Sequence, residues 1–330
     1  MNAEPQTVNT ASVEFANGKI GRNVQIRCNS FDAAGSFTIG NDVTIVADRI
    51  EVGDGATIGH STQIKAIKGV MDSLVMGDWS LIDESCNVMV PQFYCGDYTR
   101  IFRNALISGY QPVRIGHNGW FGQGAILNSA DQLAIGNNVR VGANSQIWTH
   151  VASGELLEGS RFYSEAPVTI EDNVWLVGSG VMVAPGVIMR EGSVVMAGGN
   201  VTKSTEAWRT YAGNPARDVT DKLSAWDRPD ERKKWEMLQE FVREFVDENP
   251  GESHLIVTSE TLDEVTDQLE GTLPKLIFVR YVDDWAKACA SCHSIFDLST
   301  KSYNKRRTTL EVRWHHFANG YRARFIPRLV

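Results

Sequence analysis

At 330 residues the chain is long enough for two domains, and its 42% hydrophobic and 22% charged residues are ordinary for a globular protein. The net charge of −8 argues against general nucleic-acid binding, because phosphates need a positive protein face. No apolar run reaches the length of a membrane span, and the first residues lack the basic start and apolar stretch of a signal peptide. We therefore expect a cytoplasmic protein.

The first two thirds of the chain carry an internal repeat. Apolar residues recur with a hexapeptide period within each unit, as at Ile115, Phe121 and Leu127. This period fits neither an α-helix nor a two-sided strand. It predicts a parallel β-helix with three short runs and three corners per coil, where Gly, Asn and Asp supply the turn conformations. An apolar-glycine pair also recurs at nearly constant intervals, at Ile20-Gly21, Ile39-Gly40, Ile58-Gly59, Met76-Gly77, Cys95-Gly96, Ile115-Gly116 and Ile135-Gly136.

The later coils also contain a set of specific local motifs. They are Ile135-Gly-Asn-Asn-Val139, Val168-Thr-Ile-Glu-Asp-Asn-Val-Trp175, Gly178-Ser-Gly180, Ala184-Pro-Gly-Val187, Asn200-Val-Thr-Lys203 and Ala212-Gly-Asn-Pro-Ala-Arg217. This set resembles the hexapeptide-repeat acyltransferases, the family of galactoside, maltose, serine and polysaccharide acetyltransferases. The resemblance implies a left-handed parallel β-helix over residues 20–217, after an N-terminal cap at 1–19. One residue more than the family pattern at Leu176-Val177 predicts a β-bulge.

A second domain is expected at residues 218–330, where the repeat stops. Asp227-Arg-Pro229 is a plausible helix start, followed by an apolar stripe that ends near Asn249. Strands at 254–259 and 275–282, with a helix at 261–269 between them, predict a small α/β appendage. Its basic residues either bind an anionic group or form a solvated, internally paired face, the second being the more common use. They are Lys305, Arg306, Arg307, Arg322, Arg324 and Arg328.

His150 is the candidate catalytic base. It closes the unit that begins at Ile135, and the repeat then breaks over residues 151–169. A loop beside a lone histidine on a rigid coil suits a substrate site, although a histidine in this place can also just end a run. In the resembled family a histidine just before such a loop is the general base, and the loop reaches over a neighbouring subunit.

The resemblance also assigns the coenzyme site. It implies acetyl-CoA as co-substrate, bound between the subunits of a homotrimer, and no metal. Ser179 matches the position whose backbone N–H faces the thioester oxygen, which makes it a second catalytic candidate. Asn128 and Asp131 are the candidates for binding the acceptor, although the family's asparagine one coil before the base has no clear match here. The coenzyme candidates are Trp175, Ser179, Ala197, Thr202, Lys203 and Arg217.

Two metal-based alternatives have little support. His60 and His117 both follow an apolar-glycine pair, and their units lie three coils apart, about 14 Å, which is too far for one zinc ion. Cys289-Ala-Ser-Cys-His293 has the spacing of a c-type haem attachment site, but such attachment belongs to exported proteins.

The sequence therefore predicts an acetyl-CoA-dependent O-acetyltransferase that acts on a sugar or cell-surface polysaccharide hydroxyl by direct transfer. Two alternatives remain open: an N-acetyltransferase of an amino-sugar nucleotide, and a non-catalytic β-helix scaffold. No sequence motif identifies the acceptor.

Overall fold

The computed structural model describes residues 6–9, 17–152, 154–265 and 273–328. The chain forms two compact units, Met1–Trp226 and Asp227–Val330. Residues 218–226, which the sequence analysis placed in the second domain, lie with the first unit. There the indole N–H of Trp226 donates to the carbonyl of Gly192 at 2.6 Å, and its ring packs against Trp208.

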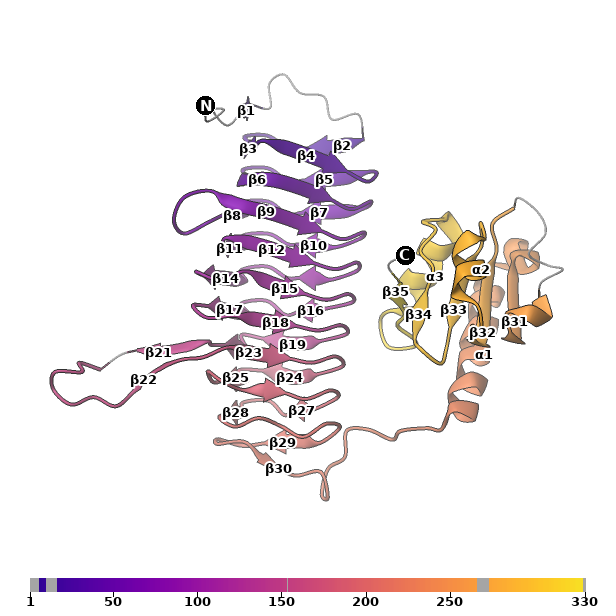
Figure 1. Ribbon diagram of the computed structural model, residues 1–330. Helices are drawn as coiled ribbons and strands as arrows, with labels where there is room; N and C mark the ends of the chain where they lie inside the picture. Colours follow the sequence, from indigo (N-terminus) through magenta and orange to yellow (C-terminus); the bar gives the residue numbers. More distant parts are fainter. Residues whose placement is uncertain (1–5, 10–16, 153, 266–272, 329–330) are drawn as a thin grey trace. The chain divides into compact units, whose positions relative to one another are not determined.

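The first unit is a parallel β-helix whose coils place one strand on each of three faces (Figure 1). Face 1 consists of β2 (Gly18–Ile20), β5 (Phe37–Ile39), β7 (Ala56–Ile58), β10 (Leu81–Ile82), β13 (Arg100–Ile101), β16 (Trp120–Phe121), β19 (Arg140–Ala143), β24 (Trp175–Ser179), β27 (Val194–Val195) and β29 (Thr210–Ala212). Face 2 consists of β3 (Gln25–Cys28), β8 (Gln63–Lys65), β11 (Asn87–Met89), β14 (Leu106–Gly109), β17 (Ile126–Ser129), β20 (Gln146–Ile147), β25 (Met182–Val183) and β28 (Asn200–Val201). Face 3 consists of β4 (Ser30–Ala33), β9 (Met71–Met76), β12 (Gln92–Cys95), β15 (Val113–Ile115), β18 (Leu133–Ile135), β23 (Val168–Ile170) and β26 (Ile188–Met189).

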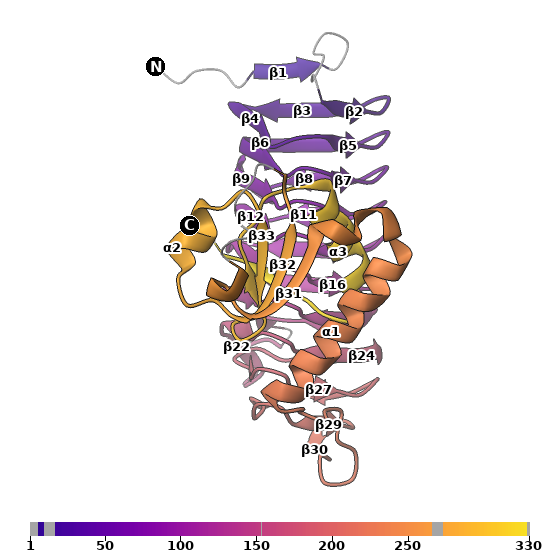
Figure 2. The ribbon, with the colours of Figure 1, turned by 90° about the vertical axis from the view of Figure 1, so that its right-hand side faces the viewer.

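Three further strands complete this unit. Strand β6 (Thr44–Val52) turns a corner and belongs to faces 2 and 3. Strand β1 (Gln6–Asn9) pairs antiparallel with β3 at one end of the stack, and β30 (Arg217–Asp218) pairs antiparallel with β29 at the other. Figure 2 shows strands of face 1 one above the next, with their arrows pointing the same way.

Apolar side chains from successive coils stack in columns inside the β-helix. On face 2 the paired residues form one such column, and each of them is at most 2% exposed. Burying an aliphatic side chain of this size contributes about 1.5–3 kcal/mol, so the stack derives its stability from many repeated contacts between neighbouring coils. The column consists of Ile64, Val88, Ile107, Leu127, Ile147, Val183 and Val201.

Each corner of a coil belongs to one of three edges. The Ser179 edge lies between faces 1 and 2, the His150 edge between faces 2 and 3, and the His117 edge between faces 3 and 1. Residues such as Asn138 and Asn173 adopt positive φ angles of 59° and 61° at the corners, which is a conformation that asparagine tolerates well.

The apolar-glycine pairs that defined the repeat belong to two different edges. The first three, through Ile58-Gly59, end strands of face 1, whereas those from Met76-Gly77 onward end strands of face 3. The coil partner of Ile58 is Ile82 and not Met76, and this coil is lengthened by the exposed loop at 67–70. The interval from Ile58 to Met76 was therefore wrongly interpreted as one coil.

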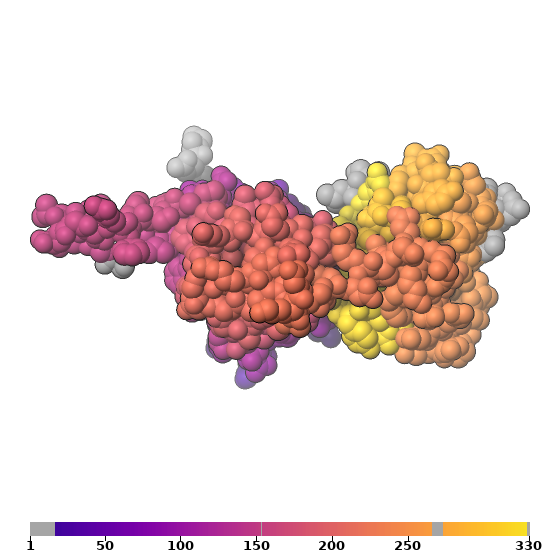
Figure 3. Space-filling model, turned by 90° about the horizontal axis from the view of Figure 1, so that it is seen from below, coloured from indigo at the N-terminus to yellow at the C-terminus, as the bar shows by residue number. Residues whose placement is uncertain are grey.

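A hairpin interrupts the regular coils beside His150. Strands β21 (His150–Ala152) and β22 (Tyr163–Glu165) pair antiparallel and form the base of an arm that projects from the stack (Figures 1 and 3). The β-bulge predicted next to Leu176 is confirmed, because the pairing of β19 with β24 shifts between Val141 and Ala143.

The second unit is an α/β domain with a five-stranded sheet. The strand order is β31 (Ile256–Thr261), β32 (Leu276–Tyr281), β33 (Ser294–Asp297), β34 (Ser302–Tyr303) and β35 (Ile326–Pro327). The helices are α1 (Glu231–Glu248), the 3₁₀ segment η1 (Pro250–Leu255), α2 (Trp285–Ala290) and α3 (Thr309–Ala318). No helix among the described residues is both long and apolar enough to span a membrane.

The sequence predicted much of this domain, with two differences. Helix α1 begins after Asp230, whose carboxylate accepts the backbone N–H of Lys233, and not at the earlier Asp227-Arg-Pro229. The predicted helix at 261–269 is a 3₁₀ turn at residues 263–265 within the described part, and residues 266–269 lie outside it.

Several of its basic side chains make internal contacts. The guanidinium of Arg306 donates to the carbonyls of Ala288 and Cys289, and that of Arg324 to Asn319 and Gly320. Arg322 pairs with Glu244 at 3.0 Å, and Arg328 lies over the ring of Trp285. These contacts agree with the internally paired alternative for the basic cluster.

Candidate active site

His150 is half-buried at the base of the arm and contacts Asn128 of the preceding coil. Its Nδ1 atom lies 2.8 Å from Asn128 Oδ1. The same Oδ1 atom faces the backbone N–H groups of Ala130 and Thr149, each at 3.4 Å, and the Thr149 hydroxyl at 3.0 Å. Backbone N–H groups only donate, so this Asn128 atom is the carbonyl oxygen.

This assignment fixes the tautomer of the imidazole. Because Asn128 Oδ1 accepts, His150 Nδ1 carries the hydrogen and donates it, and a neutral ring then keeps its lone pair on Nε2. The rings of Trp148 and His150 pack in a T-shaped arrangement with their centroids 5.8 Å apart, and the Trp148 indole N–H donates to the side-chain oxygen of Gln146. An oriented neutral imidazole with a lone pair on Nε2 is suited to accept a proton from a hydroxyl.

Asn128 and Asp131, the predicted acceptor-binding residues, are less exposed than that role suggests and make hydrogen bonds within the coil stack. Asn128 is only 8% exposed, and its amide also donates to the carbonyl of Ser108 at 3.3 Å. Asp131 is half-buried, and its carboxylate accepts the backbone N–H of Gln132. Acceptor binding by these two residues stays a prediction, whereas the contact of Asn128 with His150 is a relationship that sequence spacing alone did not indicate.

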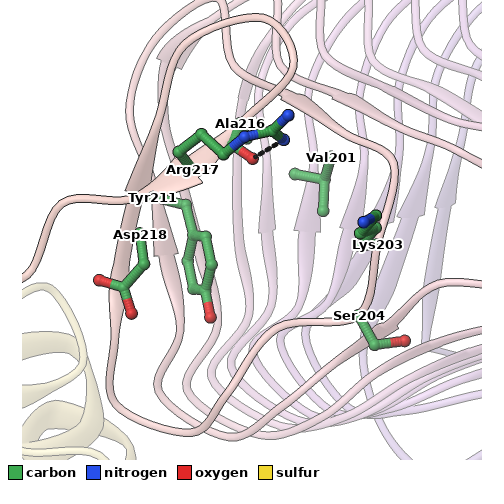
Figure 4. Close-up of a pocket in the computed structure, with 7 residues that line it drawn as sticks. All are labelled: Val201, Lys203, Ser204, Tyr211, Ala216, Arg217 and Asp218. Atoms are coloured by element: carbon green, nitrogen blue, oxygen red, sulfur yellow. Dashed lines mark hydrogen bonds between the residues drawn. The ribbon is translucent and has the colours of Figure 1, made fainter.

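A pocket of about 300 Å³ lies at the last coils of the β-helix (Figure 4). It brings together Lys203 and Arg217, two of the predicted coenzyme residues, and both are exposed. Figure 4 shows Lys203 and Ser204 on one side of it and Tyr211 and Asp218 on the other. Two cations at the mouth of an open pocket can pair with phosphate groups.

Asp218 is the acidic residue in the lining of this pocket. Arg209 donates to its carboxylate at 2.7 Å, and Thr220 donates through both its hydroxyl and its backbone N–H. Partial burial raises the pKa of Asp218, but these hydrogen bonds outweigh it and hold the pKa below its ordinary value. Arg209 therefore offsets the negative charge beside Lys203 and Arg217.

The remaining coenzyme candidates lie elsewhere on the stack. Ser179 and Ala197 occupy successive coils of the Ser179 edge, where the N–H of Gly198 donates to the Ser179 carbonyl at 3.0 Å. Trp175 is 44% exposed on face 1. Thr202 is exposed on the His150 edge, beyond the lining of the pocket.

A single chain does not bring Ser179 and His150 together. The two residues lie at opposite ends of face 2, on different edges. Ser179 pairs with Ala143, and the chain runs along the whole of face 2 between Ala143 and His150, so one side of the coil, on the order of 20 Å, separates them. A site that uses both residues therefore requires two chains.

The two histidines considered as zinc ligands have structural roles. Nδ1 of His117 accepts the backbone N–H of Asp97 at 2.9 Å, and Nδ1 of His60 accepts that of Asn41 at 2.7 Å. The two histidines lie on different edges, because His60 follows a strand of face 1 and His117 follows a strand of face 3. Within the described ranges, no group of three His, Cys, Asp or Glu side chains is placed to hold a metal ion.

His293 of the Cys-Ala-Ser-Cys-His segment is also committed to the fold. Its ring is fully buried, and Nδ1 accepts the backbone N–H of Lys275 at 3.2 Å. The five cysteines of the chain are free thiols, and burial raises the pKa of Cys95 to about 12.

No family model matches the chain. A Schizosaccharomyces pombe protein named as an acetyltransferase is 40% identical over 88 residues, 26% of this chain and 42% of that protein. The galactoside O-acetyltransferases of Escherichia coli and Lactococcus lactis are 32% and 36% identical, over 33% and 38% of this chain and 54% and 64% of their own lengths.

The solved structure of a maltose O-acetyltransferase from Clostridium difficile is 27% identical over 40% of this chain and 67% of that one, with a TM-score of 0.29. The chain spans between 42% and 64% of the length of the three curated relatives above. Over its repeat and corner motifs the chain is thus similar to acetyltransferases of the hexapeptide-repeat type, and its fold is a left-handed parallel β-helix.

Proposed function

We propose that the protein is an acetyl-CoA-dependent O-acetyltransferase whose acceptor is a hydroxyl of a sugar or polysaccharide. The observation that carries this proposal is the hydrogen bond from His150 Nδ1 to Asn128 Oδ1, which leaves Nε2 as the basic nitrogen at the base of the arm. The names of the E. coli and L. lactis relatives support a sugar acceptor.

The proposed reaction is direct transfer within a ternary complex. His150 Nε2 accepts the proton of an acceptor hydroxyl, whose oxygen attacks the thioester carbonyl of acetyl-CoA. The C–S bond then breaks as the tetrahedral oxyanion collapses, and the imidazolium returns its proton to the coenzyme A thiolate. The backbone N–H of Ser179 is the proposed donor to the oxyanion, and Lys203 and Arg217 are the proposed partners of the coenzyme phosphates.

We further propose that the enzyme is a homotrimer with its sites between subunits. Two features support this assembly. The separation of Ser179 from His150 leaves a site built from both incomplete in one chain. The arm also exposes apolar side chains that a neighbouring chain can cover, with exposed fractions of 66%, 88% and 79% at Leu156, Leu157 and Phe162.

Thiol release from acetyl-CoA tests the proposed activity. Wild type is compared with His150→Ala and with His254→Ala, an exposed histidine of the second unit, on a panel of sugars, oligosaccharides and amino-sugar nucleotides. Acceptor-dependent release that falls about 10²–10⁴-fold only in His150→Ala supports the proposal. Equal rates in all three proteins would refute the role of His150, and activity restricted to amino-sugar nucleotides would establish N-acetylation instead. Coenzyme binding without release on any acceptor would favour a scaffold.

A further inference from the structure

Tyr110 occupies the same position of its coil as His150, two coils away. Strands β14, β17 and β20 pair in register, so that Ile107, Leu127 and Ile147 lie side by side. Counting three residues on from each gives Tyr110, Ala130 and His150, all on the His150 edge. Two coils separate Tyr110 from His150 by about 10 Å, a distance that one sugar ring does not span but an oligosaccharide does.

The backbone at Tyr110 is firmly held while its side chain is open to solvent. The N–H groups of Tyr110 and Gln111 both donate to the carbonyl of Ser129, at 2.8 and 2.9 Å. The preceding Gly109 approaches Ser129 so closely that an added Cβ would lie 2.2 Å from its carbonyl carbon. The Tyr110 side chain is nevertheless 59% exposed, and the small Ala130 lies between it and His150.

Lys68 lies over this aromatic ring. It belongs to the loop between β8 and β9, which emerges on the same side of the stack as the arm (Figure 1). Its Nζ atom lies 5.5 Å from the centre of the Tyr110 ring. Within the described part of the chain, no carboxylate lies within 4.0 Å of this ammonium group. The loop also exposes Ile67 and Val70, at 43% and 44%.

We propose that Tyr110 and Lys68 form an acceptor subsite for a chain of sugars that carries carboxylate groups, with the acetylated hydroxyl at His150. This inference rests on the proposed sugar acetyltransferase activity and names the class of its acceptor. An exposed aromatic face binds the apolar face of a sugar ring, and the neighbouring ammonium binds an acidic substituent. The charge of Lys68 selects an acidic glycan over a neutral one.

Binding of defined glycans tests this subsite without depending on turnover. The full-length protein is titrated with acidic and neutral oligosaccharides of one to four sugars. Wild type, Tyr110→Ala, Tyr110→Phe and Lys68→Gln are compared, with Tyr321→Ala as the control because Tyr321 is 81% exposed in the second unit. The expected result is tighter binding of longer acidic chains, weakened about tenfold by Tyr110→Ala and retained in Tyr110→Phe. Lys68→Gln should remove the preference for acidic over neutral chains.

Three outcomes would overturn the subsite. These are binding that does not depend on chain length, binding unchanged in Tyr110→Ala, and no glycan binding at all. A change in oligomeric state of Tyr110→Ala in sedimentation would show instead that this surface contacts another copy of the chain. Glycan binding with no acetyl transfer would uphold the subsite and refute the proposed activity, so the two failures are distinguishable.

Discussion

The side-chain oxygen of Asn128 accepts hydrogen bonds from both His150 Nδ1, at 2.8 Å, and the Thr149 hydroxyl, at 3.0 Å. One buried amide therefore fixes the imidazole and the corner that carries it. Because Asn128 belongs to the coil before His150, the orientation of the proposed base depends on the register between these two coils.

Replacing Asn128 is expected to lower kcat without changing the KM for acetyl-CoA. Asn128→Ala removes the acceptor that holds His150, and misplacement of a reacting group by about 1 Å costs up to about 10²-fold in rate. Asn128→Asp keeps an acceptor oxygen and should retain more activity than the alanine variant. Steady-state kinetics provide the measurement, with thermal unfolding to separate lost activity from lost structure. Equal losses in the two variants would argue against the positioning role.

Removing the pocket cations is expected to weaken coenzyme binding. Lys203→Ala and Arg217→Ala should each raise the KM for acetyl-CoA about tenfold and leave the acceptor KM unchanged, because each removes one charge-assisted contact with phosphate. Arg190→Ala is the matched control, since Arg190 is exposed and pairs with Glu171 at 2.7 Å. If Arg190→Ala has the same effect, the pocket does not bind the coenzyme.

The arm is expected to support assembly. Serine at Leu156, Leu157 and Phe162 removes apolar surface that is exposed in a single chain, so each chain should fold normally but associate weakly. Light scattering should then give a lower mass than for wild type, and circular dichroism should be unchanged. Leu223→Ser, at a leucine that is 47% exposed outside the arm, should leave the mass unaltered. Wild-type mass in the triple variant would exclude the arm from the interface.

Lys301 is expected to make the stability of the second unit depend on pH. Burial, together with the charges of Arg324 and Lys234, lowers the pKa of Lys301 from 10.5 to about 8. The folded state therefore disfavours the ammonium form. This cost is fully present below pH 8 and disappears as the pH rises from about 8 to 10.5, where both states become neutral.

Lys301→Met tests this dependence. At about 1.36 kcal/mol per pKa unit, the cost is at most about 3–4 kcal/mol, so the variant should be more stable than wild type at pH 7. The difference in unfolding free energy should shrink towards pH 10.5. A difference that stays constant over this range would show that packing, and not charge, accounts for the effect.

The architecture could be predicted from the sequence because each coil repeats the same local chemistry. A hexapeptide apolar period and small polar corner residues such as Asn138 and Asn173 satisfy both the core and the turns. Even the bulge beside Leu176 followed from one extra residue. The change of edge between the glycine pairs could not be predicted, because all three corners favour the same residue types. A pair such as Met76-Gly77 therefore does not show to which edge it belongs.

The site was less predictable than the fold. The cations Lys203 and Arg217 stand in specific motifs, and His150 stands where the repeat breaks; the structure places the two cations in one pocket. The contact of Asn128 with His150 depends on the register between neighbouring coils, and the spacing of the repeats in the sequence predicts this register only approximately. The loop that carries Lys68 lies between two glycine pairs whose spacing looked regular, so the sequence did not indicate a loop there. The contact of Lys68 with Tyr110 was therefore found only in the structure.

The stack of coils also bears on how such a protein can diversify. Since each coil contacts only its neighbours, an insertion at an edge leaves the rest of the register intact, as both the β8–β9 loop and the arm show. Adding or deleting a whole coil between Tyr110 and His150 would move them apart or together in steps of about 4.8 Å. The β-helix thus sets the spacing between two sites on one edge in whole coils, and evolution or an engineer can change that spacing one coil at a time.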